Sequence, residues 1–263
     1  MNPNISPAIN NLLDEIVDTM KHLLGENLVG VYLHGSLAMG SFNPKISDID
    51  FLVVTKAQLS PETRRDLAKS MIQLSERAPA KGLEMSVLTV EALASFKYPT
   101  PFEFHFSNTW LDRFKNNEVD FTQEDKVDAD LAAHLTITKA RGITLYGKPI
   151  KNVFPDIPTQ YYTDSILADA KSILEDLGSE PVYNVLNLCR VWAYLEEDKI
   201  TSKKEGGEWA MNRATPFQKD VIEQALAEYA GERSVPWEEA VLSRFGREMA
   251  ERLPHGGSEP SVH

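Results

Sequence analysis

Residues 28–55 constrain the fold of this chain more than any other stretch. Two apolar runs, 28–33 and 51–54, have the β-branched and aromatic composition of buried strands, and a Gly-Ser turn and two aspartates lie between them. Because side chains alternate along a strand, Asp48 and Asp50 are expected on the same face. Two adjacent carboxylates repel one another, so this pattern predicts a compensating divalent cation such as Mg²⁺.

The Gly-Ser turn predicts a binding site for an anion. Gly35 and Ser36 lie where the first strand gives way to a predicted short helix over 36–40. Backbone N–H groups and a hydroxyl at the start of a helix attract phosphate groups. Together with the aspartates on the adjacent strand, the turn predicts a clamp for a nucleoside triphosphate and its metal. The alternative is a loop between strands whose aspartates only cap a strand.

Composition narrows the class of protein. At 263 residues the chain can form one large domain or two of ordinary size, and 42% hydrophobic with 25% charged residues is typical of a globular protein. The net charge of −12 disfavours a nucleic-acid partner and favours a cationic substrate, although it also serves solubility. The single cysteine, Cys189, excludes a disulfide framework and a cysteine-based zinc site.

The sequence also bears on location. No stretch approaches the roughly 20 apolar residues of a membrane span. The N-terminus lacks the basic and apolar segments of a signal peptide. We therefore expect a cytoplasmic protein that has no membrane partner and works as a monomer.

The sequence around the motif predicts a strand-helix-strand unit with a third carboxylate. An amphipathic helix over 9–24 is expected to cover one face of the sheet, and a helix over 61–78 leads to a strand over 83–88. Alternation along that strand places Glu84 on the face opposite to its neighbours Leu83 and Met85. Arriving beside the aspartate pair, Glu84 can ligate a metal or act as a general base on an attacking hydroxyl.

Residues 95–110 are dense in aromatic side chains and contain two prolines. This composition predicts an ordered loop rather than a regular element, either walling a pocket or packed over the edge of the sheet. A helix over 128–142 and a short strand or turn over 145–150 complete a predicted domain of residues 1–150.

The remainder of the chain predicts an all-helical domain over 161–253, after a proline-containing linker over 151–160. The predicted helices cover 161–177, 181–197, 203–212, 216–230 and 236–252. Short connections between them predict an antiparallel bundle, and the Gly-, Ser- and Pro-rich tail over 254–263 is expected to be disordered. Arg190 falls close to an apolar stripe, where a cation needs an anionic partner such as a carboxylate of the bundle.

Two groups of motifs resemble a known family. The Gly-Ser turn followed by Ser-Asp-Ile-Asp at 47–50 resembles the nucleotidyltransferase superfamily. Asn-Leu-Cys-Arg-Val-Trp at 187–192, Thr-Ser-Lys-Lys at 201–204 and Glu-Trp-Ala at 208–210 resemble, more specifically, the aminoglycoside (3'')(9) adenylyltransferases of bacterial antibiotic resistance. The resemblance implies an α/β (α+β) nucleotidyltransferase domain with a small mixed sheet, followed by an all-α helical bundle.

The resemblance also implies roles for individual residues. Asp48 and Asp50 would hold Mg²⁺, and Glu84 would be the catalytic base. The residues implied to bind ATP are Gly35, Ser36, Ser47, Arg190, Lys203 and Tyr229. The residues implied to bind the drug are Trp110, Asp176, Glu180 and Tyr183.

The implied reaction is transfer of AMP from ATP to a hydroxyl of a cationic aminoglycoside or aminocyclitol, with release of pyrophosphate. Lys171 occupies the place of a tryptophan associated with streptomycin, so spectinomycin is the favoured substrate. Two further hypotheses remain open. The clamp could serve a lincosamide, another hydroxylated metabolite or a protein, or the chain could be a non-catalytic nucleotide-binding regulator. Glu84 argues against a regulator, because binding alone needs no base.

Overall fold

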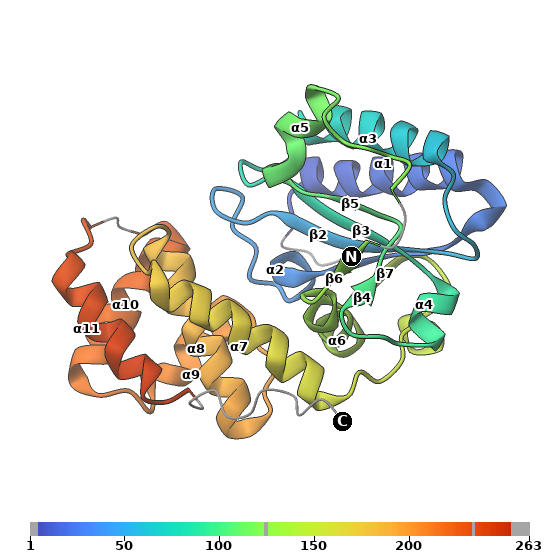
Figure 1. Cartoon of the computed structure of the whole chain (residues 1–263). Coiled ribbons are helices and arrows are strands. Elements are labelled where there is room, and N and C mark those ends of the chain that lie inside the picture. Colours follow the sequence, from blue (N-terminus) through green and yellow to red (C-terminus); the bar gives the residue numbers. More distant parts are fainter. Residues whose placement is uncertain (1–4, 124–125, 233–234, 254–263) are drawn as a thin grey trace. The chain divides into compact units, whose positions relative to one another are not determined.

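The computed structural model describes residues 5–123, 126–232 and 235–253. It divides the chain into two compact units, residues 1–165 and 166–263 (Figure 1). The tail over 254–263, for which the sequence predicts disorder, lies outside the described residues. None of the described helices combines the length and the apolar character that a membrane crossing requires.

The first unit contains strands, α-helices and short 3₁₀ helices. Its strands are β1 (Leu28–His34), β2 (Ile49–Thr55), β3 (Leu83–Thr89), β4 (Thr100–Pro101), β5 (Phe104–Phe106), β6 (Val127–Asp128) and β7 (Ile143–Gly147). Its α-helices are α1 (Pro7–Leu24), α2 (Gly35–Ala38), α3 (Pro61–Ser75), α4 (Val90–Ala94), α5 (Leu111–Lys115) and α6 (Leu131–Arg141). The 3₁₀ helices are η1 (Gly25–Asn27), η2 (Asn108–Trp110) and η3 (Ile150–Asn152).

A mixed sheet of five strands, in the order β5-β3-β2-β1-β7, forms the centre of this unit. β2 and β3 run parallel and are joined by α3, whereas the other neighbouring strands are antiparallel. This arrangement confirms the predicted strand-helix-strand unit. The register pairs His34 with Asp50 and Asp50 with Glu84, so these three residues lie in a row across β1, β2 and β3.

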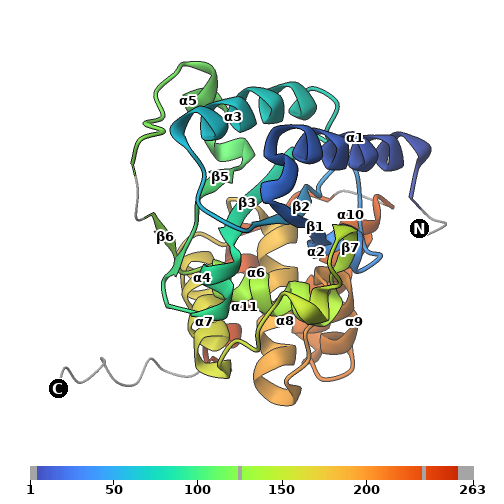
Figure 2. The ribbon, with the colours of Figure 1, turned by 90° about the vertical axis from the view of Figure 1, so that its right-hand side faces the viewer.

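Helices cover both faces of this sheet (Figures 1 and 2). α1, α3 and α5 lie on one side, where Leu83, Met85 and Val87 of β3 pack into the larger core. α6 lies on the other side, where a second core contains Leu52 of β2 and Leu88 of β3. The alternation predicted for β3 is therefore correct, and Glu84 belongs to the face that α6 covers.

Two helices of the first unit start at serine caps. The Ser6 hydroxyl accepts a hydrogen bond from the backbone N–H of Ile9 at the start of α1. The Ser60 hydroxyl does the same for Thr63 at the start of α3, as its position in the sequence predicts. A proline follows each cap at the first helical position, where its missing N–H has no cost.

The expectation of an irregular loop over 95–110 is wrong in part. Phe104–Phe106 forms strand β5, which pairs antiparallel with β3 at the edge of the sheet. The reason is a short alternation that the aromatic density conceals: Phe104 and Phe106 are buried against Phe114, whereas His105 between them faces the other side. Thr100–Pro101 also forms a short strand, β4, paired with β6.

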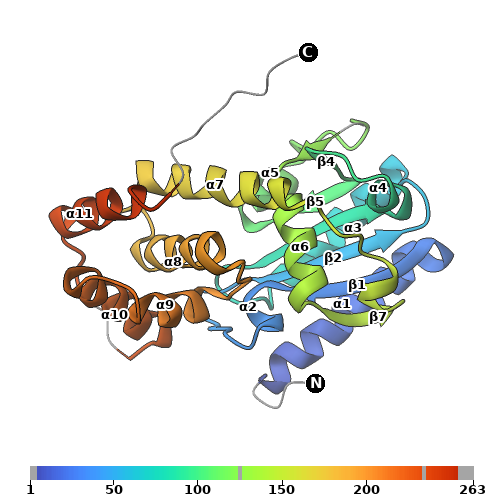
Figure 3. The ribbon, with the colours of Figure 1, turned by 90° about the horizontal axis from the view of Figure 1, so that it is seen from below.

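The regular elements in the described part of the second unit are all helices. Its helices are the later part of α7 (Thr159–Glu175), α8 (Pro181–Glu197), α9 (Lys203–Met211), α10 (Pro216–Ala230) and α11 (Glu239–Ala250). α8 lies in the middle of this unit, with α9 and α10 packed against it (Figure 3). Trp192 of α8 and Trp209 of α9 meet edge to face, with ring centroids 5.1 Å apart.

The boundary between the units falls within α7. The first unit extends to Ser165. The sequence predicts a linker over 151–160. That stretch contains the end of η3 and the first residues of α7. A continuous helix thus carries the chain from one unit into the other.

Candidate active site

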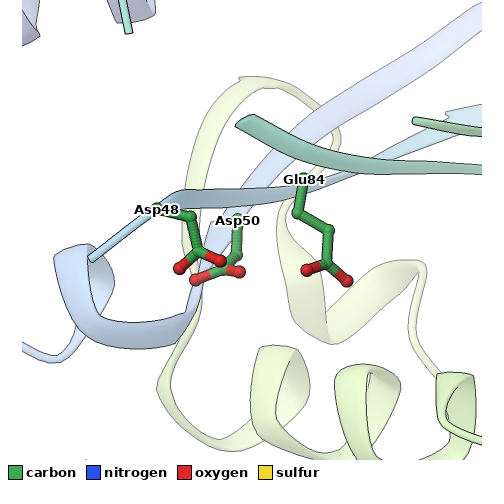
Figure 4. Close-up of side chains that lie close together, drawn as sticks. All are labelled: Asp48, Asp50 and Glu84. Carbon is green, nitrogen blue, oxygen red and sulfur yellow. The ribbon is translucent and has the colours of Figure 1, made fainter. Parts of the chain in front are cut away.

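Three carboxylates converge at one end of β2 and β3. Asp48 immediately precedes β2, Asp50 lies within it, and Glu84 lies on β3 opposite Asp50. Each offers an oxygen, and these oxygens lie within 4.8 Å of one another. Figure 4 shows all three side chains pointing to the same side of the strands. Partly buried carboxylate oxygens are the donors that Mg²⁺ prefers, so the residues present fit such an ion.

Gly35 makes room for this cluster. Its φ of +65° lies in the left-handed region, which glycine adopts without the strain that a side chain would add. A Cβ at this position would also collide with the carboxylate of Asp50. The turn after β1 therefore passes close to the acidic cluster because residue 35 has no side chain.

The hydroxyl oxygen of Ser36 is buried and has no hydrogen-bond partner in the described part of the chain. Buried polar atoms are ordinarily paired, so an orphaned hydroxyl beside an acidic cluster indicates a missing partner. A phosphate oxygen is the partner that the resemblance implies for Ser36.

Ser47 shapes the turn that precedes Asp48. Its hydroxyl accepts a hydrogen bond of 3.1 Å from the backbone N–H of Asn43, and its own N–H donates to the carbonyl of Asn43 at 2.8 Å. These two bonds close the loop from Asn43 to Ser47. The structure thus gives Ser47 a part in positioning Asp48, beside the contact with ATP that the resemblance implies.

His134 lies beside Glu84, and the sequence analysis missed it. Its Nε2 is 3.8 Å from Glu84 Oε1 and 3.1 Å from Asp130 Oδ2. Burial lowers the pKa of His134, but the carboxylates of Asp130 and Glu84 outweigh that effect and raise the pKa to about 10. A signal was present, because His134 shares the buried stripe of α6 with Leu131 and Leu135, and a polar residue on such a stripe needs a partner.

Burial also perturbs Glu84 and the other histidines of this region. It raises the pKa of Glu84, with Asp48 adding to the effect and His134 opposing it. It holds the pKa of His34, whose ring centroid is 4.9 Å from that of His134, well below its usual range. Burial likewise lowers the pKa of His105, which shares a 2.9 Å hydrogen bond with Ser86.

The second unit places each of its predicted cations, Arg190 and Lys203, where α8 meets α9. The guanidinium of Arg190 donates to the backbone carbonyl of Thr201 at 3.1 Å and to Asn187 Oδ1 at 2.9 Å. Within the second unit, as far as it is described, Arg190 has no carboxylate partner, so the alternative of a salt bridge in the bundle is wrong there. Lys203 Nζ lies 4.1 Å from the centre of the Tyr183 ring.

Local chemistry sets this geometry. Ser202 and Glu205 form a reciprocal capping box at the start of α9, which fixes the position of Lys203 at the first helical residue. Gly206 allows α9 to approach α8 closely, because a Cβ there would lie 2.9 Å from the backbone nitrogen of Arg190. Tyr229, also implied to bind ATP, is buried on α10.

The remaining residues implied to bind a drug are exposed. Asp176 follows the end of α7, and Glu180 directly precedes α8. Tyr183 is 37% exposed on α8. Trp110 is exposed to the same degree on η2 in the first unit, and the guanidinium carbon of Arg113 lies 4.3 Å from the centre of its ring.

Comparisons with known proteins agree with this architecture. The model of the aminoglycoside adenylyltransferase C-terminal domain matches residues 152–252, and that of the nucleotidyltransferase domain matches residues 13–121. A spectinomycin 9-adenylyltransferase of Staphylococcus aureus is 27% identical over 238 residues, covering 89% of this chain and 90% of that protein. One from Campylobacter jejuni is 27% identical over 244 residues, covering 90% and 91%.

A solved structure has the same fold. It is the spectinomycin adenyltransferase AAD(9) of Enterococcus faecalis, determined with ATP and spectinomycin. The similarity covers 92% of this chain and 98% of that one, with a TM-score of 0.80 and 19% identity. The family models account for both halves of the chain, and the curated proteins match it nearly end to end. The chain therefore belongs to the aminoglycoside adenylyltransferase family.

Proposed function

We propose that this protein transfers AMP from ATP to a hydroxyl of spectinomycin, or of a closely similar aminocyclitol, and thereby confers resistance to the drug. The observation that carries the proposal is the convergence of Asp48, Asp50 and Glu84 on adjacent strands of a nucleotidyltransferase domain. The names of the curated relatives, spectinomycin 9-adenylyltransferases, support the choice of substrate.

In this proposal Asp48 and Asp50 hold Mg²⁺. The bound ion would neutralise part of the negative charge on the phosphates of ATP. The unpaired hydroxyl of Ser36 and the turn at Gly35 contact the triphosphate, and Ser47 supports this site through its hydrogen bond with Asn43. Arg190 and Lys203 add positive charge to the phosphates, and Tyr229 contacts the nucleotide.

Glu84 is the general base. Its carboxylate takes the proton of the attacking hydroxyl while the drug oxygen forms a bond to the α-phosphorus of ATP. The bond between that phosphorus and the bridging oxygen breaks, and pyrophosphate leaves. Partial burial suits Glu84 to this task, because a raised pKa makes a carboxylate a better proton acceptor.

Exposed acidic residues recognise the drug in this proposal. Asp176 and Glu180 bind its ammonium groups, and the aromatic rings of Trp110 and Tyr183 contact its ring system. The net charge of −12 favours the approach of a cationic substrate.

We propose that the protein acts as a monomer in the cytoplasm, where ATP is available. Its two domains are residues 1–150 and 161–253, and residues 151–160 are the linker.

The test is incubation of the purified protein with ATP, Mg²⁺ and one drug at a time, spectinomycin and streptomycin among them. Pyrophosphate release and the mass of the drug are the measurements. We expect an AMP adduct of spectinomycin, and a weaker or absent reaction with streptomycin because Lys171 replaces the associated tryptophan. Absence of an adduct with every drug of the panel would contradict the proposed substrate class.

A further inference from the structure

A chain of polar side chains leads away from Glu84 on the side of α6. The imidazole of His134 lies 3.8 Å from Glu84 Oε1 and 3.1 Å from Asp130 Oδ2. Asp130 is itself held, because the hydroxyl of Ser165 donates to its other oxygen at 2.9 Å. The reaction proposed above uses Glu84 and leaves the other three residues without a task.

Packing fixes the imidazole in this position. The side chain of His134 is 18% exposed and shares the stripe of α6 that packs on the sheet with Leu131 and Leu135. Its ring also lies against that of His34, which is buried at the end of β1. With neighbours on these sides, the ring has little freedom to turn away from Glu84.

The position of the His134 imidazole matters because the Glu84 carboxylate can act either as a metal ligand or as a base. Its carboxylate lies in the same cluster as Asp48 and Asp50, close enough to become a third ligand of a metal ion. A carboxylate bound to a metal has its lone pairs engaged and is a weaker base toward a hydroxyl. A cationic or hydrogen-bonding neighbour on the side of α6 opposes that movement, because it attracts the same oxygens that the metal would attract.

We propose that His134, oriented by Asp130, is a positioning residue that keeps Glu84 out of the metal's coordination sphere and so reserves it as the base. The inference rests on the proposed function, since it needs Glu84 to be the base and the two aspartates to be the metal ligands. His134 itself contacts neither the metal nor the drug in this proposal. Its effect passes through Glu84 alone.

Metal binding to the free protein tests the inference without any reaction. We would titrate Mn²⁺ into four proteins: wild type, His134→Ala, Glu84→Gln and the double variant. His134→Ala should bind Mn²⁺ about tenfold more tightly than wild type, because Glu84 can then join the aspartates. In the Glu84→Gln background the same change should have no effect. Equal tightening in both backgrounds would show that only a nearby charge was removed, and would overturn the inference.

Kinetics provide the second readout. At saturating Mg²⁺, His134→Ala should lower kcat by roughly 10- to 100-fold and leave the KM for ATP almost unchanged, because none of the residues proposed to contact the nucleotide is replaced. His134→Gln, which restores an N–H donor at similar reach, should recover part of the lost kcat. If His134→Ala does not fold, His134→Gln is the variant that tests the inference. His22→Ala on the exposed face of α1 is the control and should behave as wild type.

The proposed function and the inference about His134 can be overturned by different results. If Glu84→Gln retains full transfer activity, the base assignment is wrong and the positioning role of His134 is overturned with it. If Glu84→Gln is inactive but His134→Ala has the kcat and the Mn²⁺ affinity of wild type, the proposed function stands and the inference alone is wrong.

Discussion

The two units of this protein hold their charged side chains in different ways. The first gathers three carboxylates within 4.8 Å at the ends of paired strands, and partial burial shifts the pKa of Glu84 upward. The second places Arg190 and Lys203 where α8 meets α9. The guanidinium of Arg190 is held there by a carbonyl and an amide. The first unit therefore concentrates like charges, whereas the second orients a cation with neutral groups.

The difference suggests a division of labour. A cluster of carboxylates favours a metal ion, because the ion relieves the repulsion among them. A cation that is oriented by neutral groups keeps its full charge for an anionic ligand. The first unit is therefore suited to supply the metal and the base, and the second to bind phosphates. Substitutions at the carboxylates of the first unit should therefore change metal affinity, whereas substitutions at the cations of the second unit should leave it unchanged.

The largest effect is expected from Asp50→Asn. Removing one carboxylate weakens the proposed metal site, and metal ions contribute several kcal/mol of charge stabilisation, so kcat/KM should fall about a thousandfold or more. Mn²⁺ affinity of the free protein should fall in parallel. Asp66→Asn, on the exposed surface of α3, is the matched control and should change neither quantity. If Asp50→Asn binds Mn²⁺ as tightly as wild type, Asp50 is not a metal ligand.

A smaller effect is expected from Arg190→Ala. Loss of a charged hydrogen-bond donor to phosphate costs about 1.5–3 kcal/mol, which corresponds to roughly 10- to 100-fold in kcat/KM. Mn²⁺ binding to the free protein should be unchanged, in contrast to the aspartate variant. Arg190→Lys should recover only part of the activity, because it keeps the charge and loses the guanidinium fork that Thr201 and Asn187 orient. Steady-state kinetics with ATP as the varied substrate would measure both.

Gly35→Ala should separate backbone strain from damage to the site. A side chain at positive φ costs about 1–2 kcal/mol, measurable by urea unfolding. Gly25 provides the control, because it also has positive φ but a Cβ there would meet nothing within 4 Å. Both alanine variants should lose stability, but only Gly35→Ala should lose metal affinity and activity, since its Cβ displaces Asp50. Equal activities of the two variants would argue against this account.

The smallest effect is expected at Cys189, next to Arg190 on α8. Burial raises the pKa of its thiol to about 12, so at pH 8 the thiol is almost entirely protonated. The same burial keeps the thiol out of reach of solvent. A thiol reagent should therefore not react with the native protein and should react once it is unfolded in urea. Rapid labelling of the native state would show that α8 is less firmly packed than the structure indicates.

Much of the first unit could be predicted from local patterns. Alternation along β2 and β3 placed Asp48, Asp50 and Glu84 on a common side, and the serine-proline cap located the start of α3. These features depend on residues close together in the sequence. The identity of β5 could not be read in this way, because a strand of three residues is specified by its pairing with β3 and not by its own composition.

His134 shows the same limit within the site. Its helix was predicted, but its task depends on which face of the sheet α6 covers and on the row formed by His34, Asp50 and Glu84. The surroundings of Arg190 are a mixed case. Its contact with Asn187 follows from helical spacing, whereas its contact with the carbonyl of Thr201 depends on how α9 packs on α8.

The central claim is that Asp48 and Asp50 serve the metal while Glu84 serves as the base. Glu84→Gln tests it most directly, with ATP and Mn²⁺ affinities measured on the same preparation as transfer of AMP to spectinomycin. The account predicts affinities within about twofold of wild type and a kcat reduced by roughly 10²- to 10⁴-fold, the contribution of a general base. A variant that loses Mn²⁺ binding together with activity, or one that keeps its activity, would contradict it.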